Sequence, residues 1–279
     1  MKHLFLILLA ILVFSCSSDS SDSDSNNNNT SSQKITVLEG NNQYRKMYFH
    51  YSNGKLDKVI NNNTDRDLMQ ISYQNGIVDK VIVAGYSFEE GGLDIIQNST
   101  GFDFDLNLCT DCVELDYIYS TGTLISIERD GHPIMEYDYN GSYLSETRYY
   151  TYNSFPSGQE LHRRIQYVYT SGKLSGYSVT ETDSGSTHTD IYTVMLDDKK
   201  NPFFDFEAYT GLYIPNAPSI YSRHRLHVNP TIKNNITHIY DSSGASILSV
   251  VYQYDNNDYP TSYELNSASA GTDSGTFYY

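Results

Sequence analysis

A short unit centred on tyrosine recurs along this chain, and it restricts the fold more than any other feature. In the segments 49–59, 71–81, 117–127 and 167–177, an apolar residue lies two positions before a tyrosine, a glycine three after it and an aliphatic residue five after it. The segment 137–144 keeps the tyrosine-to-leucine spacing with its glycine one position earlier, and the segments 240–247 and 252–259 are degenerate copies. The chain is therefore built largely from copies of one local structure.

Each copy has the pattern of a β-hairpin. Apolar and polar residues alternate with the period of two that is typical of strands, and pairs such as Asn53-Gly54 supply the positive φ that a tight turn needs. In a two-residue loop Tyr51 would face Leu56, whereas a three-residue loop with a glycine bulge would shift that pairing. A lone hairpin is only marginally stable, so the copies should join. The predicted fold is all-β, a twisted antiparallel meander of β-hairpins that can curl into an open barrel-like sheet.

The spacing between the hairpins is irregular, which favours a meander over a strict solenoid. Longer loops are expected at Glu89–Thr100 and around Cys109–Cys112. Residues 197–235 break the pattern with four prolines, and they predict an irregular insertion with one short helix after Pro202. We expect residues 34–279 to form a single all-β repeat domain, because all-β domains of roughly 200–250 residues are common.

The first residues of the chain predict export and a lipid anchor. Residues 1–15 combine a basic start with a short apolar run, which is the pattern of a signal peptide and is too short to span a membrane. Cys16 follows directly, in a setting that resembles the bacterial lipobox, so we expect it to carry the lipid. Residues 16–33 form a tether rich in Ser, Asp and Asn. An ordinary cleaved signal with a nearby cysteine is the alternative.

Net charge restricts the partners. The formal net charge is −16, and the tether contributes three acids without a base, so most of the excess lies in the folded part. This charge disfavours nucleic acid, which rewards neutralisation of phosphates by Lys and Arg. It equally disfavours a basic patch on anionic lipid. The predicted membrane contact is therefore the lipid on Cys16, and a glycan or an envelope protein is the partner to expect.

The combination of features resembles a known group of proteins. The Tyr-x-Tyr-x-x-Gly-x-Leu units look like the YD-type repeats of RHS-like proteins. Together with the lipobox, the tether and the segments 200–203 and 233–236, they resemble Bacteroidetes surface lipoproteins of undefined function. The resemblance implies a lipid-anchored protein of the outer membrane that faces outward. The chain has too few copies for the toxin-enclosing shell of large RHS proteins, and the group has no catalytic residues to transfer.

Two cysteines remain if Cys16 carries lipid. An even pair outside the cytoplasm predicts a disulfide between Cys109 and Cys112. The Cys-Thr-Asp-Cys spacing also matches redox and zinc motifs. A redox site belongs in a βαβ context that is not visible here, and a zinc site would need two further ligands.

One segment resembles a calcium-binding loop. Oxygen ligands stand at positions 1, 3, 5, 9 and 12 of the loop, and calcium is therefore the one candidate cofactor. These ligands are Asp103, Asp105, Asn107, Asp111 and Glu114. The segment departs from the pattern at position 6, where Leu108 replaces glycine. The alternative is an acidic strand whose carboxylates simply face solvent.

A second candidate site is basic. Arg223, Arg225 and His227 share one face if their segment is a strand, and they could bind an anionic glycan or a carboxylate. Pairing with neighbouring acids is the simpler interpretation. The sequence lacks the zinc-protease helix motif, the nucleophile elbow and a phosphate loop, which argues against an enzyme. Acid pairs such as Glu89-Glu90 could serve a glycosidase, but only geometry can select one.

The function predicted from these features is a non-catalytic surface binding or adhesion module. Most tyrosines should pack the sheet, and an exposed subset could form a platform for sugar rings or a protein. A surface enzyme acting on glycans and a structural or accessory subunit of an envelope complex remain the alternatives.

Overall fold

The structure is a computed structural model, and it describes the chain from Gln33 onward with gaps. The described residues are 33–40, 46–61, 67–84, 96–98, 101–103, 107, 112–154, 157–183, 185–204, 232–268 and 271–279. Gln33–Tyr279 forms one compact unit. Within the described residues, no helix is long and apolar enough to cross a membrane.

All regular elements in the described part are strands, as the sequence predicts. The first nine are β1 (Val37–Gly40), β2 (Lys46–Ser52), β3 (Lys55–Asn61), β4 (Asp67–Gln74), β5 (Ile77–Ala84), β6 (Ile96–Asn98), β7 (Gly101–Asp103), β8 (Val113–Ser120) and β9 (Thr123–Arg129). The others are β10 (His132–Asn140), β11 (Tyr143–Ser154), β12 (Ser157–Thr170), β13 (Lys173–Asp183), β14 (Ser186–Leu196), β15 (Ile236–Tyr240), β16 (Ser246–Tyr254), β17 (Pro260–Ser267) and β18 (Gly271–Tyr278).

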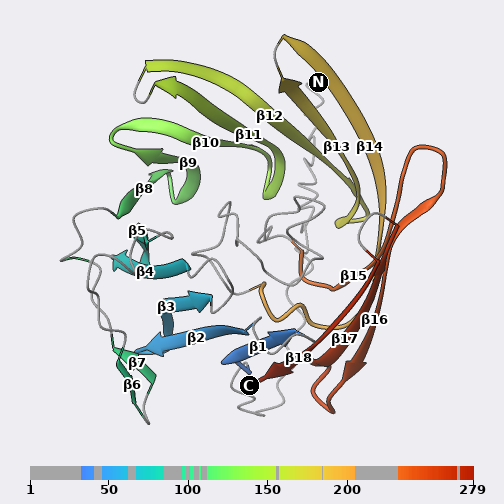
Figure 1. Cartoon of the computed structure of the whole chain (residues 1–279). Helices are drawn as coiled ribbons and strands as arrows, with labels where there is room; N and C mark the ends of the chain where they lie inside the picture. The colour runs from blue at the N-terminus through green and yellow to red at the C-terminus, as the bar shows by residue number, and fades with distance from the viewer. Residues whose placement is uncertain are drawn as a thin grey trace, which may run out of the picture. The chain divides into compact units, whose positions relative to one another are not determined.

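The strands form a closed antiparallel barrel. Sixteen of them follow one another in chain order, and β1 pairs with both β2 and β18, which closes the ring; Figure 1 labels the strands in this order. β6 and β7 form a separate two-stranded sheet. The predicted antiparallel meander is confirmed, and the sheet that was expected to be able to curl into an open barrel forms a closed one. Closure satisfies the backbone groups of the two edge strands, so the unit needs no partner strand to complete its sheet.

The repeated units are two-residue hairpins. Asn53 and Gly54 have φ values of 50° and 77°, and Tyr51 pairs with Leu56 as a two-residue loop requires. Tyr73, Tyr119, Tyr139 and Tyr169 pair in the same way with the aliphatic residues five positions later. Because consecutive strands are antiparallel, the turns of these five hairpins lie at one end of the barrel, which we call the repeat end. The opposite end is the far end.

The two degenerate copies lie at different ends. The turn 255–259 between β16 and β17 belongs to the repeat end, together with residues 33–36 and the C-terminal Tyr279. The connection 241–245 between β15 and β16 lies at the far end. The copy at 240–247 is therefore a hairpin of the opposite orientation.

Neighbouring hairpins interlock at the repeat end. The Tyr73 hydroxyl donates to the carbonyl of Leu56 at 2.7 Å, which ties one hairpin to the preceding one. Lys55 in turn places its ammonium 4.6 Å from the centroid of the Tyr73 ring and donates to the carbonyl of Gly76. Tyr51 and Lys34 repeat both contacts one step earlier. In these two steps, the preceding segment completes hydrogen bonds and a cation–π contact of the next hairpin.

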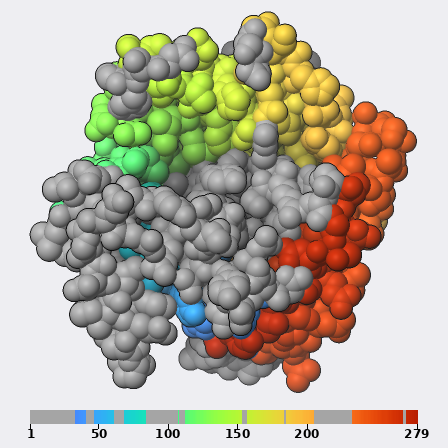
Figure 2. All heavy atoms as spheres, in the orientation of Figure 1, coloured from blue at the N-terminus to red at the C-terminus, as the bar shows by residue number. Residues whose placement is uncertain are grey.

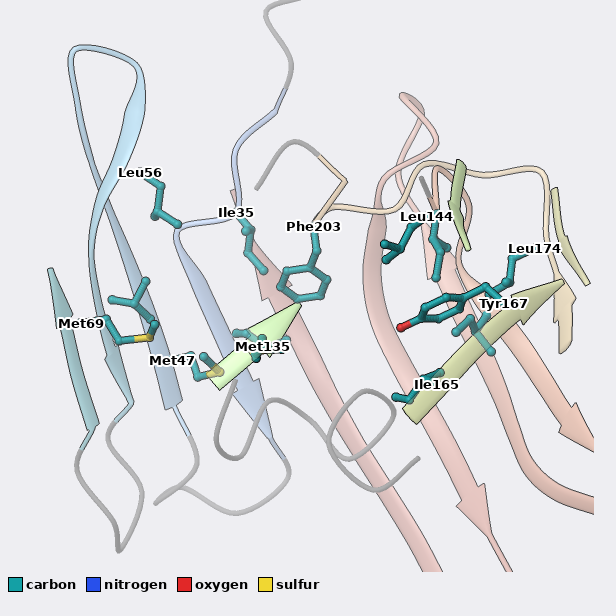
Figure 3. Close-up of a cluster of buried hydrophobic side chains, with 14 of the residues drawn as sticks. Ile35, Met47, Leu56, Met69, Met135, Leu144, Ile165, Tyr167, Leu174 and Phe203 are labelled. Carbon is teal, nitrogen blue, oxygen red and sulfur yellow. The ribbon is translucent and has the colours of Figure 1, made fainter. Parts of the chain in front are cut away.

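The hydrophobic core faces the inside of the barrel. Along most strands alternate residues are buried and their neighbours in sequence face outward, whereas the far-end halves of β12 and β14 have no buried residue. The fully buried side chains include Ile127, Ile165 and the large Tyr177 and Tyr263. Figure 3 shows Met47, Leu56 and Met69 beside Ile35 in this interior, with Ile165, Tyr167 and Leu174 across from them.

The insertion between β14 and β15 contributes to this core at the repeat end. Phe203, labelled in Figure 3, is 2% exposed. Its ring centroid lies 6.3 Å from that of Phe49 and 6.4 Å from that of Phe277. Ile232 is buried as well. Pro202–Phe204 form a turn, and residues 205–231 lie outside the described part, so the helix expected after Pro202 stays a prediction.

A polar clamp joins the two ends of the insertion. Asp197 accepts hydrogen bonds from the backbone N–H of Lys199 and of Asn235, each at 3.0 Å. Its other carboxylate oxygen accepts from the Asn235 amide at 3.2 Å and from the Tyr254 hydroxyl. Asn201 closes the clamp by donating to the carbonyl of Ile232. These contacts fix where the insertion leaves and re-enters the barrel.

Candidate ligand-binding site

A row of polar side chains crosses the inner face of four strands near the far end. Tyr149 on β11 pairs with Arg163 on β12, Arg163 pairs with Glu181 on β13, and Glu181 pairs with His188 on β14. Directly opposite residues of antiparallel strands share a face, and the buried Tyr149 places this row on the inner face. Asp190 lies on the same face, two positions after His188. We call these five residues the interior polar row.

Two polar pairs hold the row together. The Arg163 Nε donates to Glu181 Oε1 at 2.8 Å, and the guanidinium lies 5.7 Å from the centroid of the Tyr149 ring. The His188 Nε2 lies 2.8 Å from Asp190 Oδ1. Each nitrogen group in the row therefore faces a carboxylate.

The row becomes more buried from β14 towards β11. The side chain of His188 is 77% exposed and that of Asp190 49% exposed. Glu181 follows at 36% and Arg163 at 14%, and the Tyr149 hydroxyl is fully buried. The row therefore runs from solvent at His188 into the core at Tyr149.

Aromatic rings underlie the row. The ring of Tyr192, two positions after Asp190 on β14, stacks on Tyr177 with centroids 4.9 Å apart. Burial raises the pKa of Tyr192, and the neighbouring carboxylate of Asp190 raises it further. Burial also raises the pKa of Tyr149 well above the usual range, so its phenol stays protonated at neutral pH. The row can therefore offer protonated phenols, a guanidinium, an imidazole and two carboxylates beside aromatic surface.

The outer face of the same strands has a different character. Arg148 on β11 bonds Glu136 at 3.1 Å and Glu146 at 2.8 Å, and it also donates to Asp138. The hydrogen bond to Asp138 is the main cause of a raised pKa for Arg148. The outward side chains include Asp116, Gln166, Thr180, Gln253, Glu264 and Asn266. Exposed apolar side chains lie among them, namely Val168, Ile191, Met195 and Val251. Figure 2 shows β10–β14 as one continuous green-to-yellow surface.

The predicted calcium loop is only partly described. Asp103 ends β7, Asn107 is exposed, and Glu114 lies on β8, where its carboxylate pairs with Lys80 of β5. Asp105 and Asp111 lie outside the described residues. Among the residues that the structure describes, no group of three or more His, Cys, Asp or Glu side chains is arranged to hold a metal ion. Calcium binding at this loop stays a prediction.

The other predicted sites lie mostly outside the described part of the chain. This applies to Arg223, Arg225 and His227, to Glu89 and Glu90, and to Cys16 with its signal and tether. Cys112 is disulfide-bonded, but Cys109 is among the residues without a description, so the pairing of these two cysteines stays a prediction.

Sequence reasoning missed the interior polar row because no motif marks it. Arg163, Glu181 and His188 are separated by 18 and 7 positions, and only the strand register brings them together. A usable signal was present in the alternation itself. On β12 the inward positions after Arg163 are Ile165 and Tyr167, so a charged residue continues a buried stripe.

Comparisons with known proteins show only remote likeness. No family of known proteins matches the sequence, and no curated protein is similar to it. Two solved structures align with 88% of this chain and 98% of their own. A porin-like protein from Bacteroides vulgatus shares 12% sequence identity at a TM-score of 0.48. A porin-like protein from Bacteroides uniformis shares 10% identity at a TM-score of 0.33.

Proposed function

We propose that this chain is a lipid-anchored protein of the outer cell surface whose barrel is a non-catalytic binding module. The observation that carries the proposal is the direction in which the side chains face. Most of the described inner face is a hydrophobic core, with the interior polar row near the far end, and the outer face carries charged and amide side chains. A membrane-spanning barrel has the opposite arrangement, with an apolar band about 25 Å tall facing lipid.

The membrane contact is therefore assigned to the lipid on Cys16. Exposing Arg148, Glu136 and their ion-pair partners to hydrocarbon would be costly, because an arginine on the lipid face alone costs roughly 2–4 kcal/mol at the midplane. A barrel that stays in water needs a separate anchor. The leader, the lipobox-like Cys16 and the tether supply one.

A binding role follows from the interior polar row. It joins a solvent-exposed His188 to a mostly buried Arg163 beside stacked aromatic rings. A small number of polar groups that converge on an apolar surface is typical of ligand sites.

The anchor is tested by membrane fractionation of wild type and of a Cys16→Ser variant in the native host. We expect wild type in the outer-membrane fraction and accessible to protease on intact cells, and the variant absent from that fraction. Retention of a folded Cys16→Ser barrel in the outer membrane, resistant to carbonate washing, would show that the barrel itself spans the bilayer. The signal-peptide cleavage site is read from the N-terminus of each mature protein.

A further inference from the structure

We propose that the interior polar row binds a neutral oligosaccharide. This inference rests on the proposed function, because it names the ligand class of the same binding module. The charge balance, the donor and acceptor order, the spacing and the aromatic surface of the row support it.

The charge balance favours a neutral ligand. Arg163 is paired with Glu181, and His188 is paired with Asp190. An anion would have to compete with Glu181 for the guanidinium, and it would meet the carboxylate of Asp190 at the exposed end of the row. Separating a part-buried ion pair is costly, so an anionic ligand gains little here.

The order of donors and acceptors suits hydroxyl groups. A guanidinium carries five N–H donors and a carboxylate about four acceptor positions, so both can bind a ligand while their mutual bond persists. Each ligand hydroxyl donates once and accepts twice. Hydroxyls can therefore bridge Arg163 and Glu181, and again His188 and Asp190, without breaking either pair.

The spacing suits a chain of sugar rings. The row crosses β11 to β14 at right angles to the strands, and neighbouring strands lie about 4.8 Å apart, which gives a span of about 14 Å. One strand spacing is close to the length of one pyranose unit along a linear chain. Because side-chain exposure falls from His188 to Arg163, one end of the sugar chain can reach the core while the other end stays in solvent.

The aromatic surface supplies the remaining contact. Tyr192 is half-buried beside Asp190, and the guanidinium of Arg163 lies over the ring of Tyr149. The C–H face of a pyranose is apolar and packs on such rings, while its edge hydroxyls reach the polar groups. This combination of aromatic walls and few polar groups is a general feature of small-molecule sites.

The test uses the chain from residue 16 onward with Cys16→Ser, because Gln33–Tyr279 closes its own barrel. Neutral hexasaccharides of glucose, xylose and mannose are titrated by calorimetry, with a hexagalacturonate as the acidic comparison. Variants are Arg163→Gln, Glu181→Gln and His188→Gln. The matched control is Arg164→Gln, because Arg164 is the next residue of β12 and pairs with Glu146 on the outer face.

We expect at least one neutral hexasaccharide to bind and hexagalacturonate to bind more weakly. Each of the three row variants should weaken binding by about tenfold, the equivalent of one lost hydrogen bond to a charged group. The control should bind like the parent. Since His188 is 77% exposed, His188→Gln tests the row even if Arg163→Gln disturbs folding.

Three results would overturn the inference: no neutral hexasaccharide binds, the acidic one binds best, or Arg164→Gln weakens binding as much as Arg163→Gln. These results are separable from failure of the proposed function. The location of the Cys16→Ser variant reports on the anchor and does not involve the row.

Discussion

The connections between strands are uniform at the repeat end of the barrel and varied at the far end. At the repeat end, successive hairpins use the same two-residue turn, and Tyr51 and Tyr73 each donate a hydrogen bond to a backbone carbonyl of the preceding segment of the chain. At the far end, connections range from the tight Asp130-Gly131 turn to the long segment between β5 and β8. The strands β11–β14 are also longer than their neighbours there. We infer that the repeat end carries stability, and that the far end is where side chains are available for binding.

Alkaline pH should have the largest effect, because it acts on the interior that joins the two ends. Burial raises the pKa of Tyr137, Tyr149 and Tyr177 well above the usual range and that of Tyr139 to about 12. Tyrosines of the unfolded chain ionise at about pH 10. The unfolded chain therefore loses more protons than the folded one above that pH, and the free energy of unfolding falls as the pH rises.

The measurement is a pH titration followed by circular dichroism and tyrosinate absorbance. We expect the interior tyrosines to ionise together as the barrel unfolds, above the pH at which exposed tyrosines titrate. Gradual ionisation of all tyrosines in a barrel that stays folded would contradict a core that depends on their neutral form.

The second largest effect is expected at the clamp of the repeat end. Asp197→Ala removes the acceptor of hydrogen bonds from Lys199, Asn235 and Tyr254, and it should lower the free energy of unfolding by about 3 kcal/mol. Asp190→Ala at the far end is the matched control, because Asp190 is about half-exposed. Urea unfolding measures the free energy of unfolding of both variants. Equal losses would contradict the inference that the repeat end carries more of the stability.

The clamp also shows how far the sequence could predict this structure. The hairpins were predictable, because each is set by local alternation and a positive-φ turn, as at Asn53-Gly54. Closure was not, because it depends on β1 meeting β18 from the opposite end of the chain. The same holds for Asp197, whose partners Asn235 and Tyr254 lie 38 and 57 positions away. The interior polar row is likewise a product of register rather than of any motif.

A smaller effect is expected from Tyr73→Phe at the repeat end. The substitution keeps the ring under Lys55 and removes only the hydrogen bond from the Tyr73 hydroxyl to the carbonyl of Leu56. The expected loss is about 1 kcal/mol in the free energy of unfolding. Tyr143→Phe is a suitable comparison, because Tyr143 is exposed and packs its ring on Tyr169. A loss for Tyr143→Phe as large as that for Tyr73→Phe would show that the carbonyl bond adds nothing.

The smallest effect is expected at the exposed end of the interior polar row. His188→Ala should change the free energy of unfolding by less than about 0.5 kcal/mol, because the side chain is 77% exposed and its partner Asp190 is open to water. Urea unfolding of this variant beside Tyr73→Phe compares the two ends directly. A loss of about 1 kcal/mol or more for His188→Ala would mean that the row stabilises the barrel, and the assignment of binding to the far end would lose its structural basis. A neutral result would leave His188 as a residue that the fold does not need, which is the condition for changing it to probe binding alone.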